Sequence, residues 1–402
     1  MTGIGYRSRR LRVTVREGSC TFPGMQKFSR FAVIPVLFLL ASSASAFADD
    51  DAHNTCAGPE HDPASLVSIP ADDAIHVNAD GSYKYPYEEW YWNAVMEGAD
   101  GHTYGVEVLG FQFSIGTSIT PIVQIAMTDV ASGTYTSQLV FGASAYPYVP
   151  NGFNIELADE TGSFSAIGGA GSDALSFRFA DGTTVELAFN SLKDPTPSWF
   201  NGYASLVDPV TGKDHGDQYY YNRRSMLAYG TIQRPGQHEV TVLGDGWFDR
   251  EFGSLIGTPG SPADNVNWKW FSIHLSDGSD YMVWDIYAND TGNRVLHVIN
   301  KVGAAPACSE TLITDFDITS TGQTVSTAGP PPATLETGHK LSIPSEKLEL
   351  TIEPLATNQI ALTGGLFAPF FEGASIMYGT ENGLPVVGTG YYEQFVSCCQ
   401  SP

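Results

Sequence analysis

Basic residues are scarce in this 402-residue sequence. It contains 20 Lys and Arg against 44 Asp and Glu, which gives a formal net charge of −24 at pH 7. Phosphate binding needs a concentrated basic surface, so the composition argues against nucleic acid as a partner. Charged residues of both signs make up only 16% of the chain and apolar residues 42%, so the chain can bury a large core and does not have the composition of a disordered protein.

Sustained helical periodicity and long apolar runs are also nearly absent. No segment approaches the roughly 20 continuous apolar residues of a membrane-spanning helix, so we expect no stable membrane insertion. Short segments such as Thr184–Phe189 and Leu348–Glu353 instead carry apolar residues at every second place, and turn dipeptides such as Asp100-Gly101 separate segments of this kind. This pattern is typical of half-buried strands and predicts an all-β fold.

One apolar stretch, Phe31–Ala41, has the features of a signal peptide. It follows a short basic region and precedes small residues that end at Ala46 and Ala48. Residues 25–48 are therefore predicted to be a signal peptide that is cleaved near one of these two alanines, which makes the mature protein secreted or periplasmic. Residues 1–24 are interpreted as an extension that precedes the true start.

Cysteine is sparse, and the residues that remain after cleavage are Cys56, Cys308, Cys398 and Cys399. An even number in an exported chain favours one or two disulfides, with the pairing left open. The sequence contains no EF-hand-type loop and no cluster of His and Cys with ligand spacing, so we predict no metal site. Without residues 1–48 the chain has 13 basic and 43 acidic residues, and we interpret this acidity as a solvated surface.

Two parts of the sequence are similar to each other. Trp90-Tyr91-Trp92 and Trp268-Lys269-Trp270 lie 178 residues apart, and each is followed by an Asp-Gly turn and then a Tyr. Both predict a hairpin, and the repeat suggests two similar β-domains, although two hairpins can also resemble each other by chance. The predicted organisation is an extended arm over 49–80, an N-terminal domain over 81–235 and a C-terminal domain over 236–402.

The stretch Gly244–Ser254 places charged side chains among aromatic rings. In a strand its central residues would divide between two faces, with Trp247, Asp249 and Glu251 on one and Phe248, Arg250 and Phe252 on the other. A carboxylic acid among rings can keep its proton, because desolvation disfavours the charged form. Asp249 and Glu251 are therefore candidate catalytic acids.

Asp285 is the leading candidate acid, because Val283 and Tyr287 flank it on an apolar strand face. A structural role is the alternative for all three carboxylates. Arg250 could hold Asp249 in a buried ion pair, and Asp285 could make a structural hydrogen bond.

Aromatic rings stabilise cations through their negative faces, although large aromatic residues more often fill a core. The residues predicted to bind a substrate are Trp247, Arg250, Trp268, Trp270, Trp284, Tyr281, Glu89 and Trp92. The sequence contains no Gly-x-Ser-x-Gly elbow and no recognisable protease-type Cys and His pair, so nucleophilic hydrolysis is not indicated.

Five stretches of the sequence resemble the AttH-like family of secreted proteins. They are Glu89–Trp92, Tyr219–Tyr221, Gly246–Phe252, Trp268–Phe271 and Gly388–Glu393. This family is similar to the carotenoid hydratases (hydroxyneurosporene synthases), to a fungal isoflavonoid hydratase and, more distantly, to fungal Diels-Alderases. The resemblance implies tandem lipocalin-like antiparallel β-barrels with an apolar ligand pocket. Arg250 and Phe252 stand where the hydratase branch has His and Trp, so carotenoid hydration as such is not implied.

The function expected from these features is that of an enzyme that acts on an apolar isoprenoid or polyketide-like small molecule. A hydratase or lyase that protonates a double bond would need neither a metal nor an organic cofactor. Two alternatives remain, namely a lipocalin-like carrier of lipids or pigments and a pericyclase that acts by confinement. The sequence does not indicate an oligomeric state.

Overall fold

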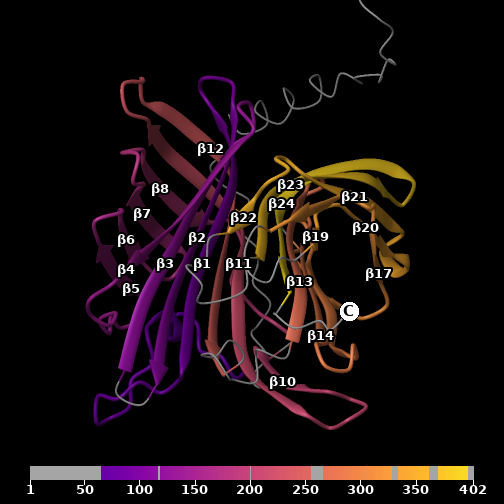
Figure 1. Cartoon of the computed structure of the whole chain (residues 1–402). Coiled ribbons are helices and arrows are strands. Elements are labelled where there is room, and N and C mark those ends of the chain that lie inside the picture. The colour runs from indigo at the N-terminus through magenta and orange to yellow at the C-terminus, as the bar shows by residue number, and fades with distance from the viewer. Residues whose placement is uncertain are drawn as a thin grey trace, which may run out of the picture. The chain divides into compact units, whose positions relative to one another are not determined.

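Strands dominate the computed structural model, as the sequence predicted (Figure 1). The structure describes residues 65–115, 118–199, 201–254, 266–305, 307–327, 334–361 and 370–396. No helix in these ranges is long and apolar enough to cross a membrane. The predicted signal peptide, the preceding extension and the first part of the predicted arm lie outside the described residues.

The first sheet has twelve strands in the order β4-β3-β2-β1-β12-β11-β8-β7-β6-β5, with β9 and β10 paired to β11. Its strands are β1 (Tyr87–Gly98), β2 (Thr103–Ile115), β3 (Ser118–Asp129), β4 (Thr134–Phe141), β5 (Phe153–Ala158), β6 (Ser163–Gly168), β7 (Ser172–Arg178), β8 (Thr184–Ser191), β9 (Thr196–Pro197), β10 (Tyr203–Val207), β11 (Asp214–Gln233) and β12 (Val240–Gly253).

The second sheet has ten strands in the order β16-β15-β14-β13-β24-β23-β21-β20-β17, with β22 paired to β23. Its strands are β13 (Val266–Leu275), β14 (Asp280–Ala288), β15 (Arg294–Val302), β16 (Glu310–Ile313), β17 (Asp317–Ser320), β20 (His339–Ile343), β21 (Leu348–Pro354), β22 (Ile360–Ala361), β23 (Phe370–Glu381) and β24 (Leu384–Phe395). A separate ribbon pairs β18 (Thr324–Ser326) with β19 (Thr334–Glu336), and the 3-10 turns are η3 (Ala71–Asp73) and η5 (Pro344–Glu346).

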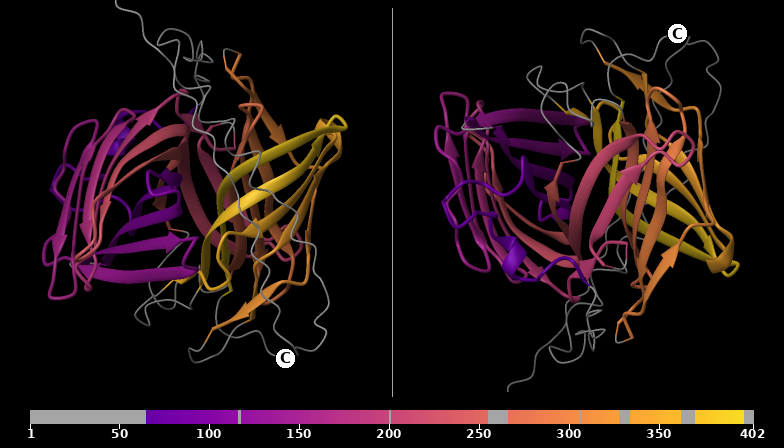
Figure 2. Two further views of the ribbon diagram at one scale, coloured as in Figure 1. Left: turned by 90° about the horizontal axis from the view of Figure 1, so that it is seen from above. Right: turned by 90° about the horizontal axis from the view of Figure 1, so that it is seen from below.

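The two antiparallel sheets are both bent (Figure 2), and their buried apolar side chains form three layers. The first core takes side chains from strands all around the first sheet, and the second core does the same in the second sheet. The third layer, which we call the middle layer, combines residues of both sheets, including Tyr91 and Trp247 from the first and Trp268, Trp270 and Trp284 from the second. This arrangement agrees with the predicted pair of lipocalin-like barrels.

Both predicted hairpins are confirmed, since β1 pairs with β2 and β13 pairs with β14. Their tryptophans nevertheless face different layers. Trp90 and Trp92 point into the first core, whereas Trp268 and Trp270 point into the middle layer. Because strand side chains alternate, an offset of one residue between the two copies is enough to reverse the face.

The boundary between the two halves lies later than predicted. β12 follows the predicted boundary at 235/236, but it pairs with β1 and β11 and so belongs to the first sheet. The strands therefore change from the first sheet to the second between Gly253 and Val266. The backbone partners of β12, which the sequence pattern does not reveal, determine this placement.

The described part of the predicted arm is packed into the first sheet. Asp73 in η3 is fully buried, and both of its carboxylate oxygens accept hydrogen bonds from Arg223, at 2.7 and 2.6 Å. The indole N–H of Trp90 donates to the Asp73 carbonyl at 2.9 Å. Buried charges need such partners, so the arm is an integral part of the fold.

Candidate active site in the middle layer

β12 divides its side chains between two layers in the predicted way. Trp247 lies in the middle layer, and Phe248 and Phe252 lie in the first core. By alternation, Asp249 and Glu251 extend into the middle layer with Trp247, and Arg250 extends into the first core. The acids and the base of this stretch are therefore on opposite faces of one strand.

Six carboxyl groups extend into the middle layer from five strands. We call them the acid cluster, and they are Glu89 on β1, Glu107 on β2, Asp249 and Glu251 on β12, Glu372 on β23 and Glu393 on β24. Five are buried, and Glu393 keeps some accessible surface. Each follows the alternation of middle-layer residues on its own strand, as Glu393 does between Tyr391 and Phe395.

Two pairs within the acid cluster are direct neighbours across strands. Glu89 lies opposite Glu251 on β1 and β12, and Glu372 lies opposite Glu393 on β23 and β24. Like charges in such positions are destabilising. At a separation of about 5 Å and an effective dielectric constant near 20, two carboxylates repel each other by about 3 kcal/mol. Each pair therefore favours a state in which at least one member is protonated.

The pKa values of the acid cluster are raised, chiefly by burial. Burial raises the pKa of Asp249 to about 8, although hydrogen bonds from Tyr220 and Trp247 oppose the rise. Burial also raises the pKa of Glu107 to about 8 and that of Glu393 to about 7. These side chains consequently hold protons near neutral pH, as carboxyl groups in apolar surroundings do.

The remaining members have pKa values raised well above the usual range. For Glu89 and Glu251 burial acts first, and repulsion from neighbouring carboxylates adds to it, from Glu251 on Glu89 and from Asp249 on Glu251. For Glu372 burial is reinforced by Glu393. The six groups form one electrostatic unit, because the charge on one member disfavours charge on the others.

Three tryptophans of the middle layer bind this unit through their indole N–H groups. Trp247 donates to Asp249 at 2.6 Å and Trp268 donates to Glu393 at 2.7 Å. Trp270 donates at 3.2 Å to the hydroxyl of Tyr220, which in turn hydrogen-bonds Asp249. These contacts fix both the rings and the carboxyl groups, with the N–H edge of each ring toward its acceptor.

Polar side chains connect the other members of the acid cluster. Tyr91 donates to Glu372 at 2.6 Å, and the side-chain amide of Asn93 donates to the Tyr91 hydroxyl at 3.3 Å. Gln124 donates to both oxygens of Glu107, at 3.1 and 3.2 Å. Gln218 donates to Glu251.

Arg250 has a structural role in the first core. Its guanidinium pairs with Glu88 and donates to the backbone carbonyls of Asp72, Ala74, Glu89 and Glu251 at 2.7 to 3.0 Å. It also stacks over the ring of Trp90, with the guanidinium carbon 4.0 Å from the ring centroid. Burial raises the pKa of Glu88, but Arg250 and His76 together keep this pKa below its usual value. The predicted ion pair with Asp249 is therefore wrong, because alternation directs Arg250 to the other face.

Replacing Arg250 with Met is expected to lower the free energy of unfolding by about 3 kcal/mol, because it leaves the buried carboxylate of Glu88 without its guanidinium partner. Denaturant unfolding measures this change. Arg178→Met is the matched control, since Arg178 is exposed, and its effect should stay within about 0.5 kcal/mol. A loss below about 1 kcal/mol in the Arg250 variant would contradict the structural role.

Asp285 lies apart from the acid cluster. Its neighbours Trp284 and Ile286 face the middle layer, and Asp285 faces the second core together with Val283. There it is buried and pairs with Arg294 at 3.2 Å and His297 at 2.9 Å, and it accepts a hydrogen bond of 2.5 Å from Tyr287. The prediction of Asp285 as the leading acid is not supported, because its oxygens are occupied by Arg294, His297 and the Tyr287 hydroxyl.

Two more of the predicted binding residues face away from the middle layer. Trp92 lies in the first core, where its indole N–H donates to Asp173 at 3.0 Å. Tyr281 lies in the second core beside Lys301, whose ammonium is 5.2 Å from the ring centroid. The structure thus brings together Asp249, Glu251, Glu89 and the remaining four predicted tryptophans, and it places Asp285, Arg250, Trp92 and Tyr281 elsewhere.

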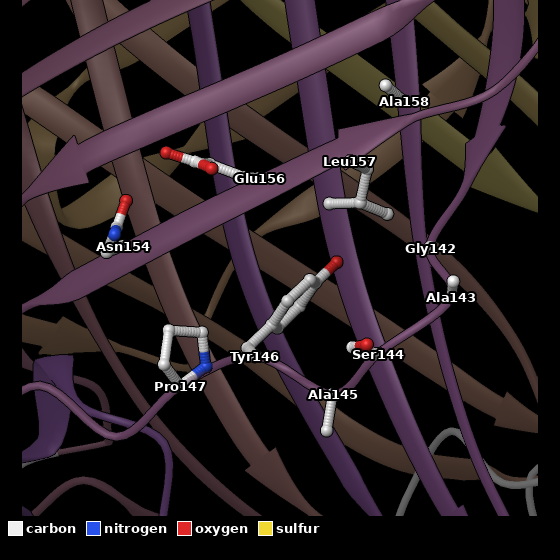
Figure 3. Close-up of a pocket in the computed structure, with 10 residues that line it drawn as sticks. All are labelled: Gly142, Ala143, Ser144, Ala145, Tyr146, Pro147, Asn154, Glu156, Leu157 and Ala158. Carbon is white, nitrogen blue, oxygen red and sulfur yellow. The ribbon is translucent and has the colours of Figure 1, made fainter.

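None of the residues that line a pocket in the first sheet belongs to the acid cluster (Figure 3). Residues 142–147, which follow β4, and Asn154, Glu156, Leu157 and Ala158 of β5 line it. Its one carboxylate, Glu156, is exposed, so it lacks the burial that distinguishes the acid cluster. Among the described residues, no group of three or more His, Cys, Asp or Glu side chains is arranged to hold a metal ion.

Cys308 is disulfide-bonded, in agreement with the prediction that the cysteines form at least one disulfide. The other four cysteines of the chain lie outside the described residues. Buried Cys308 follows β15 in the second half of the chain.

Comparisons with known proteins place this architecture among solved folds. The crystal structure of an AttH protein of Nitrosomonas europaea superposes with a TM-score of 0.67 at 21% sequence identity, covering 84% of this chain and 98% of that one. Kievitone hydratase from Nectria haematococca superposes with a TM-score of 0.65 at 14% identity, covering 86% and 97%. These identities are low, so the likeness concerns the fold.

No curated protein matches the sequence significantly. The model of the family described as AttH-like matches residues 60–394. This range includes every strand of both sheets except the last residue of β24, and it contains the whole acid cluster. The chain therefore belongs to the AttH-like family.

Proposed function

We propose that this protein is a hydratase that adds water to a carbon–carbon double bond of an apolar isoprenoid or polyketide-like molecule. The observation that carries the proposal is Asp249, a carboxyl group with a pKa of about 8 that two aromatic side chains hold in a buried layer. Protonation of carbon needs an acid that still has its proton at the working pH, and burial among rings provides this. The fold that the chain shares with kievitone hydratase adds support.

The proposed reaction has two steps. The carboxyl group of Asp249 gives its proton to one carbon of the double bond, and the π electrons form the new C–H bond, which leaves a carbocation on the other carbon. The oxygen of a water molecule then bonds to this carbon and releases a proton to the Asp249 carboxylate. The balance is one water molecule added, with the acid restored.

Aromatic rings of the middle layer serve the cationic stage. Trp247 and Trp270 meet edge to face with their centroids 6.0 Å apart, and both belong to the hydrogen-bonded unit around Asp249. A desolvated cation over such a ring is stabilised by about 2 kcal/mol. The same low polarity that raises the pKa of Asp249 also strengthens this attraction.

We assign to the pair of Glu89 and Glu251 the role of binding the water molecule that is added. The two side chains are cross-strand neighbours, and both have pKa values raised by burial and by repulsion from neighbouring carboxylates. A pair that shares one proton can accept a hydrogen bond from water through one member and donate one through the other. Neither step of this mechanism needs a metal ion or an organic cofactor.

Incubation with prenylated phenols in ¹⁸O-labelled water tests the proposal. The expected product contains one ¹⁸O atom for each double bond lost, as measured by mass spectrometry. Binding without conversion would instead identify a lipocalin-like carrier. Conversion without ¹⁸O would identify a pericyclase that acts by confinement, and either of these results would overturn the hydratase proposal.

We also propose that the protein is exported, with residues 25–48 as its signal peptide. The disulfide at Cys308 supports this, because disulfides persist mainly in oxidising compartments. The protein recovered from periplasm or medium is expected to have the intact mass of a chain that begins directly after Ala46 or Ala48. A full-length product confined to the cytoplasm would contradict the proposal.

A further inference from the structure

The seven tryptophans of the chain all lie in the described residues, and they differ in how their indole N–H groups are used. Five donate hydrogen bonds, namely Trp90, Trp92, Trp247, Trp268 and Trp270. The N–H groups of Trp199 and Trp284 are buried and have no hydrogen-bond partner in the structure. Buried indole N–H groups usually find an acceptor, and leaving one unpaired is unfavourable.

Both exceptions belong to the middle layer and contact the same residue. Trp199 lies 5.5 Å and Trp284 lies 6.0 Å from Tyr220, measured between ring centroids. Tyr220 in turn hydrogen-bonds Asp249. The two rings that carry the unpaired donors therefore both contact the side chain that hydrogen-bonds the proposed proton donor.

The backbone of Trp199 provides a second, independent sign of function. Its φ is +55°, a left-handed conformation that a bulky side chain rarely adopts. The backbone N–H of Trp199 donates to Asn300 at 3.3 Å, a contact that links the segment between β9 and β10 to β15 of the second sheet. Unfavourable backbone conformations of this kind are concentrated at ligand-binding and active sites.

We infer that Trp199 and Trp284 donate hydrogen bonds to an oxygen atom of the substrate, which is therefore an oxygenated apolar molecule and not a pure hydrocarbon. The inference rests on the proposed function, because it places this oxygen in the layer that contains Asp249. A carbonyl, hydroxyl or ether oxygen would satisfy donors that are otherwise unpaired, and the surrounding rings would bury the carbon skeleton. A site built to hydrogen-bond a polar atom discriminates strongly against analogues that lack it.

Farnesal, farnesol and farnesene test the inference, because they share an isoprenoid skeleton and differ in oxygen. We expect the aldehyde and the alcohol to bind about tenfold more tightly than the hydrocarbon, as measured by calorimetry. In Trp199→Phe and Trp284→Phe this preference should fall to about threefold or less, while the affinity for farnesene stays within about twofold. Trp92→Phe, which removes an indole N–H in the first core, is the matched control and should keep the full preference.

The indole N–H signals of the unaltered protein supply a readout that needs no variant to fold. In ¹⁵N-tryptophan-labelled protein, addition of farnesal should move the signals of Trp199 and Trp284 downfield and leave that of Trp92 in place. Equal affinity for all three probes, or no binding of either oxygenated probe, would overturn the inference. So would a preference that survives in both tryptophan variants.

Failure of this inference can be told apart from failure of the proposed function. Binding is measured in Asp249→Asn, in which turnover of the probes should be negligible, so a preference for oxygenated probes there, together with no hydration activity in the unaltered protein, would uphold the tryptophan donors and reject the hydratase. Hydration of farnesene at the same rate as farnesol would uphold the hydratase and reject the tryptophan donors.

Discussion

Asp249→Asn is expected to lower kcat/KM for hydration by about 10³-fold, because an amide cannot give a proton to carbon. Asn keeps the size of Asp and can still accept hydrogen bonds from Trp247 and Tyr220, which both bind the carboxyl group. Ligand affinity should consequently stay within about threefold. Steady-state kinetics together with calorimetry separates the loss of chemistry from any loss of binding.

Asp285→Asn is the informative control for this experiment. Asp285 faces the second core and pairs with Arg294 and His297, so its replacement should reduce stability and leave the kcat of the folded protein within about twofold. Hydration should also decline above about pH 8, where Asp249 loses its proton. Full activity in Asp249→Asn, or inactivity in a folded Asp285→Asn, would show that the acid has been assigned wrongly.

The native protein is expected to become less stable as the pH rises from 6 to 8. Asp249 and Glu107 have pKa values of about 8 in the folded chain, and their usual values are 3.8 and 4.5. Over this range the folded state holds protons that the unfolded state has lost, so unfolding becomes easier with increasing pH. Each retained proton changes the free energy of unfolding by about 1.4 kcal/mol for each pH unit, and each is half lost by pH 8, so the two groups together give a fall of about 4 to 5 kcal/mol.

Other groups do not reverse this sign. His339, whose pKa burial lowers to about 3, favours the native state as the pH rises, but this contribution is complete near pH 6.5, where the unfolded residue loses its charge. The double variant Asp249→Asn with Glu107→Gln should show a clearly flatter profile in denaturant unfolding. The matched control is Glu186→Gln, an exposed carboxylate on β8, which should keep the original slope. Stability that is constant or rises from pH 6 to 8 would mean that these carboxyl groups are ionised in the fold.

Local patterns in the sequence predicted the strands and the division of β12 into two faces. Period-two alternation is a property of the strand itself, so Trp247, Asp249 and Glu251 could be placed together before any partner strand was known. The same reasoning could not decide which face of β14 meets the first sheet. Asp285 has apolar neighbours on its face, but the partners that occupy it, Arg294 and His297, come from the next strand.

Half of the acid cluster was missed for a related reason. Glu107, Glu372 and Glu393 each lie between apolar or small residues on one face of their strands, which is a signal that alternation could have identified. Their common destination is not a local property. It depends on β2, β23 and β24 turning the same faces toward one layer, and long-range packing decides this.

Both faces of β12 carry side chains with a defined role. One face positions Asp249 and Glu251 in the middle layer, and the other face uses Arg250 to hold the carbonyl groups of Asp72 and Ala74. β12 therefore supports both the segment Asp72–Ala74 and the acids, although more than 170 residues separate this segment from Asp249. A chain shortened to begin at β1 would lose the carbonyl groups that Arg250 binds, so removing this segment should disturb the acids on the opposite face of β12.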